Sequence, residues 1–317
     1  MALSDLAYIV LLALSALFAF RTVRYAVRLL RGHNRRRMLE PLLGSLGDGA
    51  GGAGLSLIGV DIDSAETVAD MLATEYRHFE AVVVVDSART PQLLGTLVET
   101  YSLVSVDYRR PDSFAPAVGV RGLYRSRQRR FRRLTLIDTA ALSPQNDADA
   151  AADIAIYDYV AVVHGNTTLL PLAVERIAAE IASAEVPPHE ICTRAGAELT
   201  VCMRDDVFRH GGFASGRHFC PPSQRVPLYE TIAVTTGWSR GVRIVAAAFI
   251  ALLAAAALFS WWVGSPVPAA VVAATAILAL ASVLFSMPFV APHLTGRRAF
   301  AYTLRNFCEK LLLKSSQ

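Results

Sequence analysis

Apolar residues form short, nearly continuous runs through the middle of the chain. LSLIGV (55–60), FEAVVVVD (79–86) and YDYVAVVH (157–164) contain few polar positions, which is typical of strands buried on both faces of a sheet. LVSVDY (103–108) and RLTLID (133–138) are shorter runs of the same kind, and the second of these suits either an inner strand or an edge of the sheet. The pattern therefore predicts five strands between residues 55 and 164.

Helical segments alternate with these strands. Asp63 and Glu66 suit the start of a helix that runs through Tyr76, and residues 92–101 suit a second helix. Alternation of this kind predicts an α/β fold with a mostly parallel sheet and helices on both faces. Such sheets bind ligands at the carboxyl ends of their strands, here near residues 61–63, Asp86 and residues 164–166.

Three longer apolar segments predict membrane spans. Residues 6–20 carry no charge, and residues 242–263 and 267–290 form a pair joined by Gly264-Ser265-Pro266. A secretory signal peptide is the rival interpretation of the first segment, but its arginines follow the apolar run, whereas a signal peptide has them before it. We therefore expect one N-terminal transmembrane helix and a C-terminal transmembrane hairpin.

Composition and charge support this view. Apolar residues make up 53% of the 317 residues, charged residues 18%, and the mean hydropathy is +0.38, which is high for one water-soluble domain. Residues 21–37 contain seven Arg and no acid, whereas residues 38–240 contain 18 Arg against 25 Asp and Glu. Positive charge thus flanks the apolar segments, which disfavours a nucleic-acid-binding protein.

The positive-inside rule gives an orientation in an inner (cytoplasmic) membrane of the bacterial type, with the N-terminus outside and the main domain and C-terminus in the cytosol. The bilayer is then a partner. The arginines at residues 21–31 suit a basic stripe on its cytoplasmic leaflet, and the alternative is a solvated helix end. The predicted segments are an N-terminal transmembrane helix with basic stripe (1–37), a Gly-rich linker (38–54), a cytosolic domain (55–240), a transmembrane hairpin (241–292) and a basic amphipathic tail (293–317).

The cysteines exclude two classes of structure. Cys192, Cys202, Cys220 and Cys308 include no C-x-x-C pair, so neither a disulfide scaffold nor a cysteine zinc site is expected. The sequence also lacks H-E-x-x-H, G-x-S-x-G and the P-loop pattern, which leaves metalloprotease, serine hydrolase and P-loop nucleotidase readings without support.

Five segments in order carry a resemblance. They are LSLIGVDIDSAET, YRHFEAVVVVDSART, YDYVAVVHGNTTLLPLAVERI, ELTVCMRDDVFRHGGF and GWSRG, the last followed by apolar segments. This order resembles the inverting family 2 glycosyltransferases of the nucleotide-diphospho-sugar transferase (GT-A) fold, over about residues 55–245. The resemblance implies a GT-A-like domain, and the apolar segments suit the membrane-bound members that make polysaccharides.

The positions that carry chemistry in that family are altered here. The acidic pair after the second strand is reduced to Asp86, and the metal-binding D-x-D is replaced by His164-Gly165-Asn166. Imidazole and a neutral amide supply no charge for Mg²⁺ or Mn²⁺, so no metal and no resident cofactor are expected. Asp86, His164 and Asn166 remain as a remnant nucleotide pocket. The alternatives are a turn or cap role for Asp86 and a structural role for His164.

The remaining catalytic elements are also missing. Residues 214–237 are too few for the usual helix that bears the general base, and Trp238 is all that remains of Q-x-x-R-W. We therefore expect no catalytic residue, and predict a pseudoenzyme that acts as a partner or scaffold subunit in cell-surface polysaccharide synthesis. The alternatives are a working metal-independent glycosyltransferase, or a sensor of nucleotide or lipid-linked sugar. Mg²⁺ or Mn²⁺ with a nucleotide-sugar would be used only by an active enzyme.

One basic segment stands apart from the acidic domain. Seven arginines lie between Arg121 and Arg133, in VRGLYRSRQRRFRR (120–133). Such a run suits anionic lipid, a polyanionic glycan or an acidic partner, and its default reading is a solvated helix face. His189, Glu190 and His210 fall in segments that suggest loops. Residues 299–314 suggest an amphipathic helix that lies on the membrane or packs on the domain.

Overall fold

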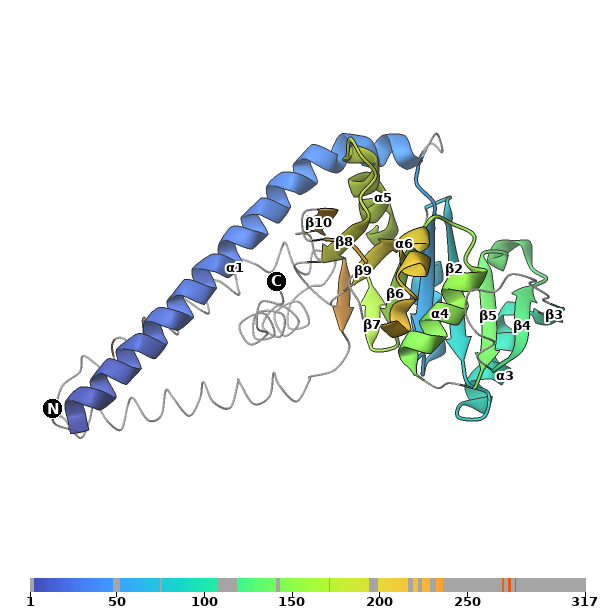
Figure 1. Cartoon of the computed structure of the whole chain (residues 1–317), viewed down its shortest axis with the longest axis horizontal. Helices are drawn as coiled ribbons and strands as arrows, with labels where there is room; N and C mark the ends of the chain where they lie inside the picture. Colours follow the sequence, from blue (N-terminus) through green and yellow to red (C-terminus); the bar gives the residue numbers. More distant parts are fainter. Residues whose placement is uncertain are drawn as a thin grey trace. The chain divides into compact units, whose positions relative to one another are not determined.

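A computed structural model of the chain describes the architecture (Figure 1). The chain divides into two compact units, Arg36–Thr236 and the combination of Met1–Arg35 with Gly237–Gln317. The structure describes residues 3–47, 52–74, 76–107, 119–140, 143–170, 172–193, 199–215, 219–221, 224–228, 232–235, 270, 273–274 and 277.

Helix α1 is longer than the sequence indicated. It spans Leu3–Gly47 and includes Pro41, so residues 38–47 are helical and not part of a Gly-rich linker. The physical reason is burial, because Leu39 and Leu46 belong to the main hydrophobic cluster of the second unit. Helix propagation through this stretch is therefore stabilised by packing.

Within the described residues, no helix is long and apolar enough to cross a membrane. The first predicted span, residues 6–20, falls within α1. The second predicted span, residues 242–263, lies outside the described residues, as does the tail at 299–314. Of the third predicted span, residues 267–290, the structure describes only residues 270, 273, 274 and 277.

The second unit is built around a nine-stranded sheet with the order β10-β8-β9-β6-β1-β2-β5-β4-β3. Seven strands run in one direction and only β4 and β9 run against them, which confirms a mostly parallel sheet. The strands are β1 (Leu55–Val60), β2 (Phe79–Val85), β3 (Leu103–Val106), β4 (Val120–Ser126), β5 (Leu134–Thr139), β6 (Tyr159–His164), β8 (Glu190–Thr193), β9 (Thr200–Met203) and β10 (Arg225–Leu228).

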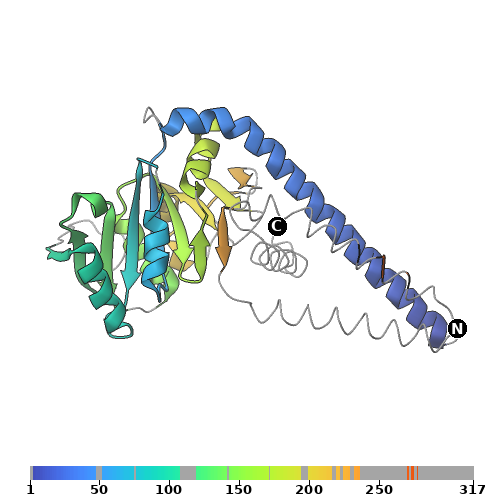
Figure 2. The same cartoon turned by 180° about the vertical axis from the view of Figure 1, so that it is seen from behind.

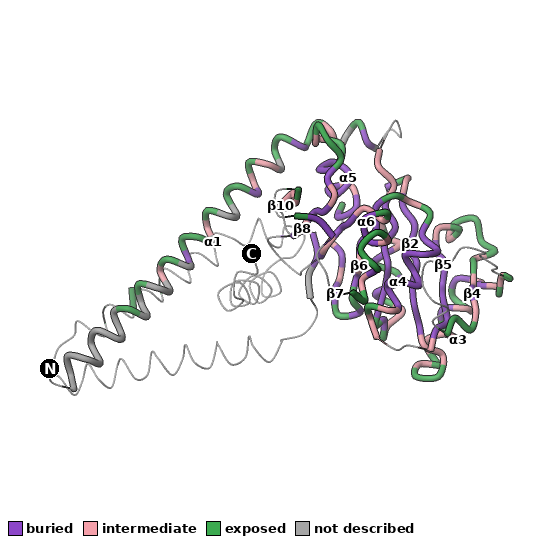
Figure 3. The backbone as a smooth tube through the Cα atoms, in the orientation of Figure 1, coloured by how far each residue is buried: buried purple, intermediate pink, exposed green. Residues whose placement is uncertain are grey.

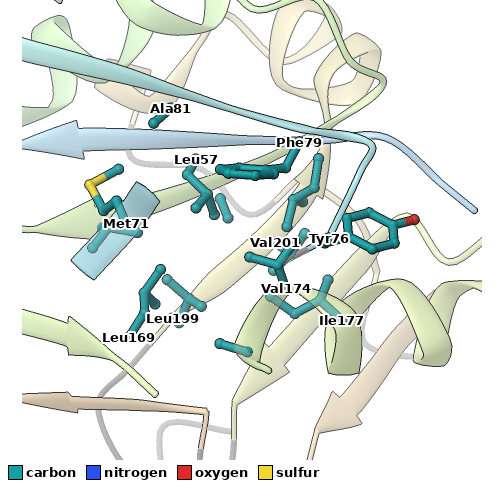
Figure 4. Packing of buried hydrophobic residues seen from close by; sticks show 14 of the residues in the cluster. Leu57, Met71, Tyr76, Phe79, Ala81, Leu169, Val174, Ile177, Leu199 and Val201 are labelled. Carbon is teal, nitrogen blue, oxygen red and sulfur yellow. The ribbon is translucent and has the colours of Figure 1, made fainter. Parts of the chain in front are cut away.

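Helices cover both faces of this sheet, as predicted. One hydrophobic cluster includes residues of α2 (Ala65–Leu72), α3 (Pro91–Tyr101) and α5 (Ala173–Ser183), and the other includes residues of α4 (Pro144–Ile154) and α6 (Arg204–Arg209). Helix α4 lies in front of the sheet in Figure 1, whereas α2 lies in front in the reverse view of Figure 2. The first cluster joins Leu57 and Phe79 of the sheet to Val174 and Ile177 of α5 (Figure 4).

Strands are added on opposite sides of β1, so that β1 is the switch point of the sheet. From β1 the chain proceeds through α2 to β2 on one side, and later returns from β5 through α4 to β6 on the other side. Parallel α/β sheets form a crevice at such a switch point, at the carboxyl ends of the strands. A separate two-stranded antiparallel sheet pairs β7 (Thr167–Leu169) with β11 (Ala233–Thr235).

Three local predictions were wrong. Helix α2 is capped by Ser64 and not by Asp63. It ends at Leu72 and not at Tyr76, because the Tyr76 side chain is buried and its hydroxyl donates to the Ala53 carbonyl. The arginine-rich segment is the strand β4 followed by the 3₁₀ turn η1 (Arg129–Phe131), and not a helix. The apolar residues of β4 pack inward while it pairs with β3 and β5, which favours the strand.

His189 and His210 lie outside helices and strands, as predicted, whereas Glu190 lies in a strand. Glu190 is the first residue of β8, and His210 is the C-cap residue of α6. Glu190 is buried, and its two carboxylate oxygens accept hydrogen bonds from the thiols of Cys192 (2.9 Å) and Cys220 (3.4 Å). Arg225 of β10 adds an ion pair to the same carboxylate at 3.4 Å, which compensates the burial of its charge.

Candidate functional site

An acidic pocket of about 420 Å³ lies at the carboxyl ends of β1 and β2. This is the switch point of the sheet, where a ligand crevice is expected. Four aspartates and one arginine contribute to its walls, together with apolar side chains and one threonine. The lining residues are Asp61, Ile62, Asp63, Val84, Val85, Asp86, Arg89, Thr90 and Asp147.

The backbone after β1 is held in an unusual conformation. Asp61 has a φ of 52°, in the left-handed region that few non-glycine residues adopt. Gly165, just after β6, donates its amide to the Val60 carbonyl at 2.9 Å. A Cβ atom on Gly165 would lie only 1.9 Å from the Asp61 carbonyl oxygen. The close contact of these two backbones therefore requires glycine at position 165, and it sets the position of the Asp61 side of the pocket.

Asp86 organises the turn between β2 and α3. Its Oδ1 accepts a hydrogen bond from the Ala88 amide at 3.0 Å, and its carbonyl accepts from the amides of Arg89 (3.1 Å) and Thr90 (2.8 Å). Arg121 of β4 donates to the same Oδ1 at 3.0 Å. Asp86 thus has the turn role that the sequence left open as an alternative, and it also faces the pocket.

The charge of Asp86 is stabilised by these partners. Desolvation acts to raise the pKa of Asp86, but the hydrogen bonds from Ala88 and Arg121 and the positive charge of Arg121 outweigh it. The pKa of this carboxyl therefore lies below its ordinary value, and Asp86 is ionised at neutral pH.

A second carboxylate behind Asp86 was not found by sequence reasoning. Asp138 of β5 is buried and accepts hydrogen bonds from the amide (2.8 Å) and hydroxyl (2.7 Å) of Ser87. Arg121 lies between the two acids, 3.0 Å from Asp86 and 3.7 Å from Asp138. Because Asp138 lies in an apolar strand about 50 residues along the chain from Ser87, only the pairing of β2 with β5 reveals this cluster.

Asp147 closes the pocket from α4. Its side chain is buried, and its Oδ1 accepts a hydrogen bond from the Thr139 hydroxyl at 2.9 Å. Burial raises the pKa of Asp147, and the negative charges of Asp61 and Asp86 raise it further, against the opposing effects of Thr139 and Arg89. Ionised Asp147 is therefore a destabilising group in the folded protein.

Replacing Asp147 with asparagine is expected to stabilise the protein at neutral pH. A carboxyl with a raised folded-state pKa contributes stability below its unfolded pKa of about 3.9, and this contribution is lost as the pH rises through the folded pKa. D147N retains an acceptor for Thr139 without the charge, so its Tm should exceed the wild-type value by about 2–4 °C, the shift from roughly 1 kcal/mol.

Thermal melts between pH 4 and pH 8 measure this effect. The difference between D147N and wild type should grow with pH, whereas D205N, at an exposed position of α6, should track the wild-type curve. A constant difference across this range would contradict a raised pKa at Asp147.

The other two predicted residues lie at the end of β6. His164 is exposed and is paired in register with Val60, the last residue of β1. Asn166 is exposed, and its Oδ1 accepts a hydrogen bond from the Thr167 hydroxyl at 3.3 Å. The structure therefore brings Asp86 together with Asp61, Asp63 and Asp147, whereas neither His164 nor Asn166 contributes to the lining of this pocket.

The charges of the pocket limit its chemistry. Arg89 is the one cation among its described lining residues, against four aspartates. Across the part of the chain that the structure describes, no group of three or more His, Cys, Asp or Glu side chains is arranged to hold a metal ion. A diphosphate would meet unfavourable potential here, whereas hydroxyl donors would find carboxylate acceptors.

Comparisons with known proteins add no family to this description. The chain matches neither a protein-family model nor a curated protein. Its class is therefore defined by the structure itself, as an α/β protein with an acidic pocket at the switch point of its sheet.

Proposed function

We propose that this protein is a membrane-embedded relative of the family 2 glycosyltransferases that has the fold without the reaction. Its role is that of a partner or scaffold subunit for a catalytic glycosyltransferase or an exporter in cell-surface polysaccharide synthesis. The resemblance of five ordered segments motivates the family, and the mostly parallel sheet with helices on both faces is compatible with it. A shared fold alone does not carry the activity.

The main observation that supports a loss of activity is the negative charge of the pocket. Transfer from a nucleotide-sugar releases a diphosphate, whose negative charge a metal ion or cations must neutralise. Among the described lining residues there are four aspartates and one arginine. The resemblance matches the family's metal ligands to His164 and Asn166, which carry no negative charge. Asp86 is engaged with Ala88 and Arg121, so its carboxylate already has a structural role.

The membrane location rests on the sequence. Three apolar segments, at residues 6–20, 242–263 and 267–290, support an inner-membrane protein. Arginines follow the first segment and flank the pair formed by the other two, which by the positive-inside rule places the main domain in the cytosol. The N-terminus and the short Gly264-Ser265-Pro266 turn then lie outside. This placement gives the domain access to membrane-bound enzymes that polymerise sugars.

Calorimetric titration tests the proposal. The detergent-purified full chain is titrated with UDP, GDP and their common sugars, with and without Mn²⁺, beside the variant D86A. We expect no metal-dependent binding and no sugar transfer, because a diphosphate is repelled by the aspartates of the pocket. Mn²⁺-dependent binding that D86A abolishes would instead support an active enzyme.

The same titration separates the remaining alternatives. Metal-independent binding without any product would favour a sensor, whereas transfer without metal would favour an active transferase. The partner role is measured by affinity purification from the source membrane. A glycosyltransferase or polysaccharide exporter should co-purify, and its polymer output should fall when this chain is removed. A chain that never co-purifies with such a protein would overturn the partner role.

A further inference from the structure

Exposed arginines gather at the end of the sheet opposite the pocket. We call residues 127–133, which connect β4 to β5, the arginine turn. Because β4 is antiparallel to β5, and β5 is parallel to β2 and β1, this turn lies where β1 and β2 begin. The turn is drawn mostly as exposed in Figure 3, and its exposed arginines are Arg127, Arg129, Arg130 and Arg132.

A second segment adds to this charge. Arg77 is exposed and lies two residues before Phe79, the first residue of β2. Arg133 fastens the turn to this segment, because its Nη1 donates to the Tyr76 carbonyl at 2.8 Å and its guanidinium lies 4.8 Å from the Phe79 ring centre. Burial lowers the pKa of Arg133, and the nearby charges of Arg132 and Arg77 lower it further. Two segments distant in sequence therefore contribute to one positive surface.

The turn is held in place by ring packing and a backbone hydrogen bond. Phe131 packs edge-to-face on Tyr101 of α3 with ring centres 4.9 Å apart, and the Arg127 amide donates to the Ser102 carbonyl at 3.1 Å. Among the residues that the structure describes, no carboxylate pairs with the exposed arginines of this surface. These arginines are Arg77, Arg127, Arg129, Arg130 and Arg132.

The chain from the N-terminal segment enters the domain at the same end of the sheet. Tyr76 donates its hydroxyl hydrogen to the Ala53 carbonyl at 2.8 Å, just before β1. Leu39 and Leu46 of α1 share a hydrophobic cluster with Tyr76 and Phe79. The arginine turn therefore lies at the end of the second unit where β1 begins, and the chain before β1 includes the first predicted membrane segment.

We infer that the arginine turn and Arg77 bind anionic phospholipid headgroups of the cytoplasmic leaflet. This inference rests on the membrane location in the proposed function. Arginine forks match phosphate oxygens with two hydrogen bonds, and the cytoplasmic leaflet carries the negative charge that these arginines lack within the described protein. The acidic pocket is at the opposite ends of the strands, so lipid contact leaves it open to the cytosol.

Tryptic cleavage in defined bilayers tests this binding. The full chain is reconstituted in nanodiscs of phosphatidylcholine alone or with phosphatidylglycerol, and cleavage is followed after Arg127, Arg129, Arg130 and Arg132. Phosphatidylglycerol should slow cleavage in the turn about fivefold or more, since one arginine near an anionic surface contributes roughly that factor. Cleavage after Arg209, whose side chain is 70% exposed on α6, serves as the internal control and should not change. High salt should remove the protection.

A matched pair of variants localises the effect. R77Q leaves every cleavage site of the turn intact and should reduce the protection severalfold, whereas R209Q should leave it unchanged. Equal cleavage rates in both kinds of nanodisc would overturn the inference. Protection by a soluble acidic polysaccharide, such as alginate, with none from phosphatidylglycerol would also overturn it in favour of a glycan.

Flotation of the full chain with vesicles separates this inference from the proposed function. If the chain floats with phosphatidylcholine but phosphatidylglycerol gives no protection, the headgroup binding is contradicted and the proposed membrane location is retained. If the chain floats only with phosphatidylglycerol, the headgroup binding is supported and the proposed membrane spans are contradicted. If the chain floats with neither kind of vesicle, both are contradicted.

Discussion

Substituting alanine for Gly165 is expected to destabilise the protein by about 3 kcal/mol or more, the upper range for inserting atoms into a packed site. The added Cβ would lie 1.9 Å from the Asp61 carbonyl oxygen and 3.1 Å from the Ile62 Cα. Because these are backbone atoms, no side-chain rotation relieves the clash, and the loop after β1 must move. The Tm should fall by about 6–12 °C, as expected for a unit of this size.

Gly95 provides the matched control. It lies inside α3, and a Cβ at this position would meet no atom within 4 Å beyond its chain neighbours and the helix's own backbone. Helical glycine costs conformational entropy, so G95A should stabilise the protein by about 0.5–1 kcal/mol. Thermal melts of both variants measure the contrast. A G165A protein as stable as G95A would show that the backbones at 61 and 165 are not in close contact.

Introducing two acids at the end of β6 is expected to create a metal site. The variant H164D/N166D adds two carboxylates beside the loop of Asp61, since position 164 pairs in register with Val60. Mn²⁺ prefers charged oxygen ligands, and the affinity of such sites follows the number of carboxylates. We expect Mn²⁺ affinity to rise by roughly 100-fold, the scale on which metal sites respond to their ligand shells.

Calorimetric titration with Mn²⁺ alone measures this gain without requiring activity. The variant Q92D/Q128D adds the same charge at two exposed positions away from β6 and should bind no better than wild type. If H164D/N166D behaves like this control, residues 164–166 do not occupy the position of the family's metal ligands, and the proposed relationship loses its main support.

The strands were predictable because a strand buried on both faces is a run of apolar residues. Residues 55–60 and 79–85 are apolar almost throughout, and both form strands that are buried along their whole length. The segment 120–133 was mistaken for a helix face because its arginines mask the inward residues Leu123 and Tyr124 of β4. Pairing with distant strands decided the structure there, and single-sequence patterns carry no information on pairing.

The pocket was only partly predictable for a similar reason. Asp86 was found because it directly follows a buried strand, and Asp61 and Asp63 were located near the same edge. Asp147 and Asp138 were missed as site residues, because Asp147 reaches the pocket from α4 and Asp138 contacts Ser87 only through the pairing of β5 with β2. Both depend on tertiary contacts between segments about 50 residues or more apart in sequence.

The strand at one end of the sheet order, β10, contains Pro227. An outer strand normally presents unpaired amide groups to which another chain can add, which leads to aggregation. Proline has no amide hydrogen, so a further strand cannot form a complete ladder on β10. Proline at this end of the described sheet therefore disfavours the addition of a strand from another copy of the chain.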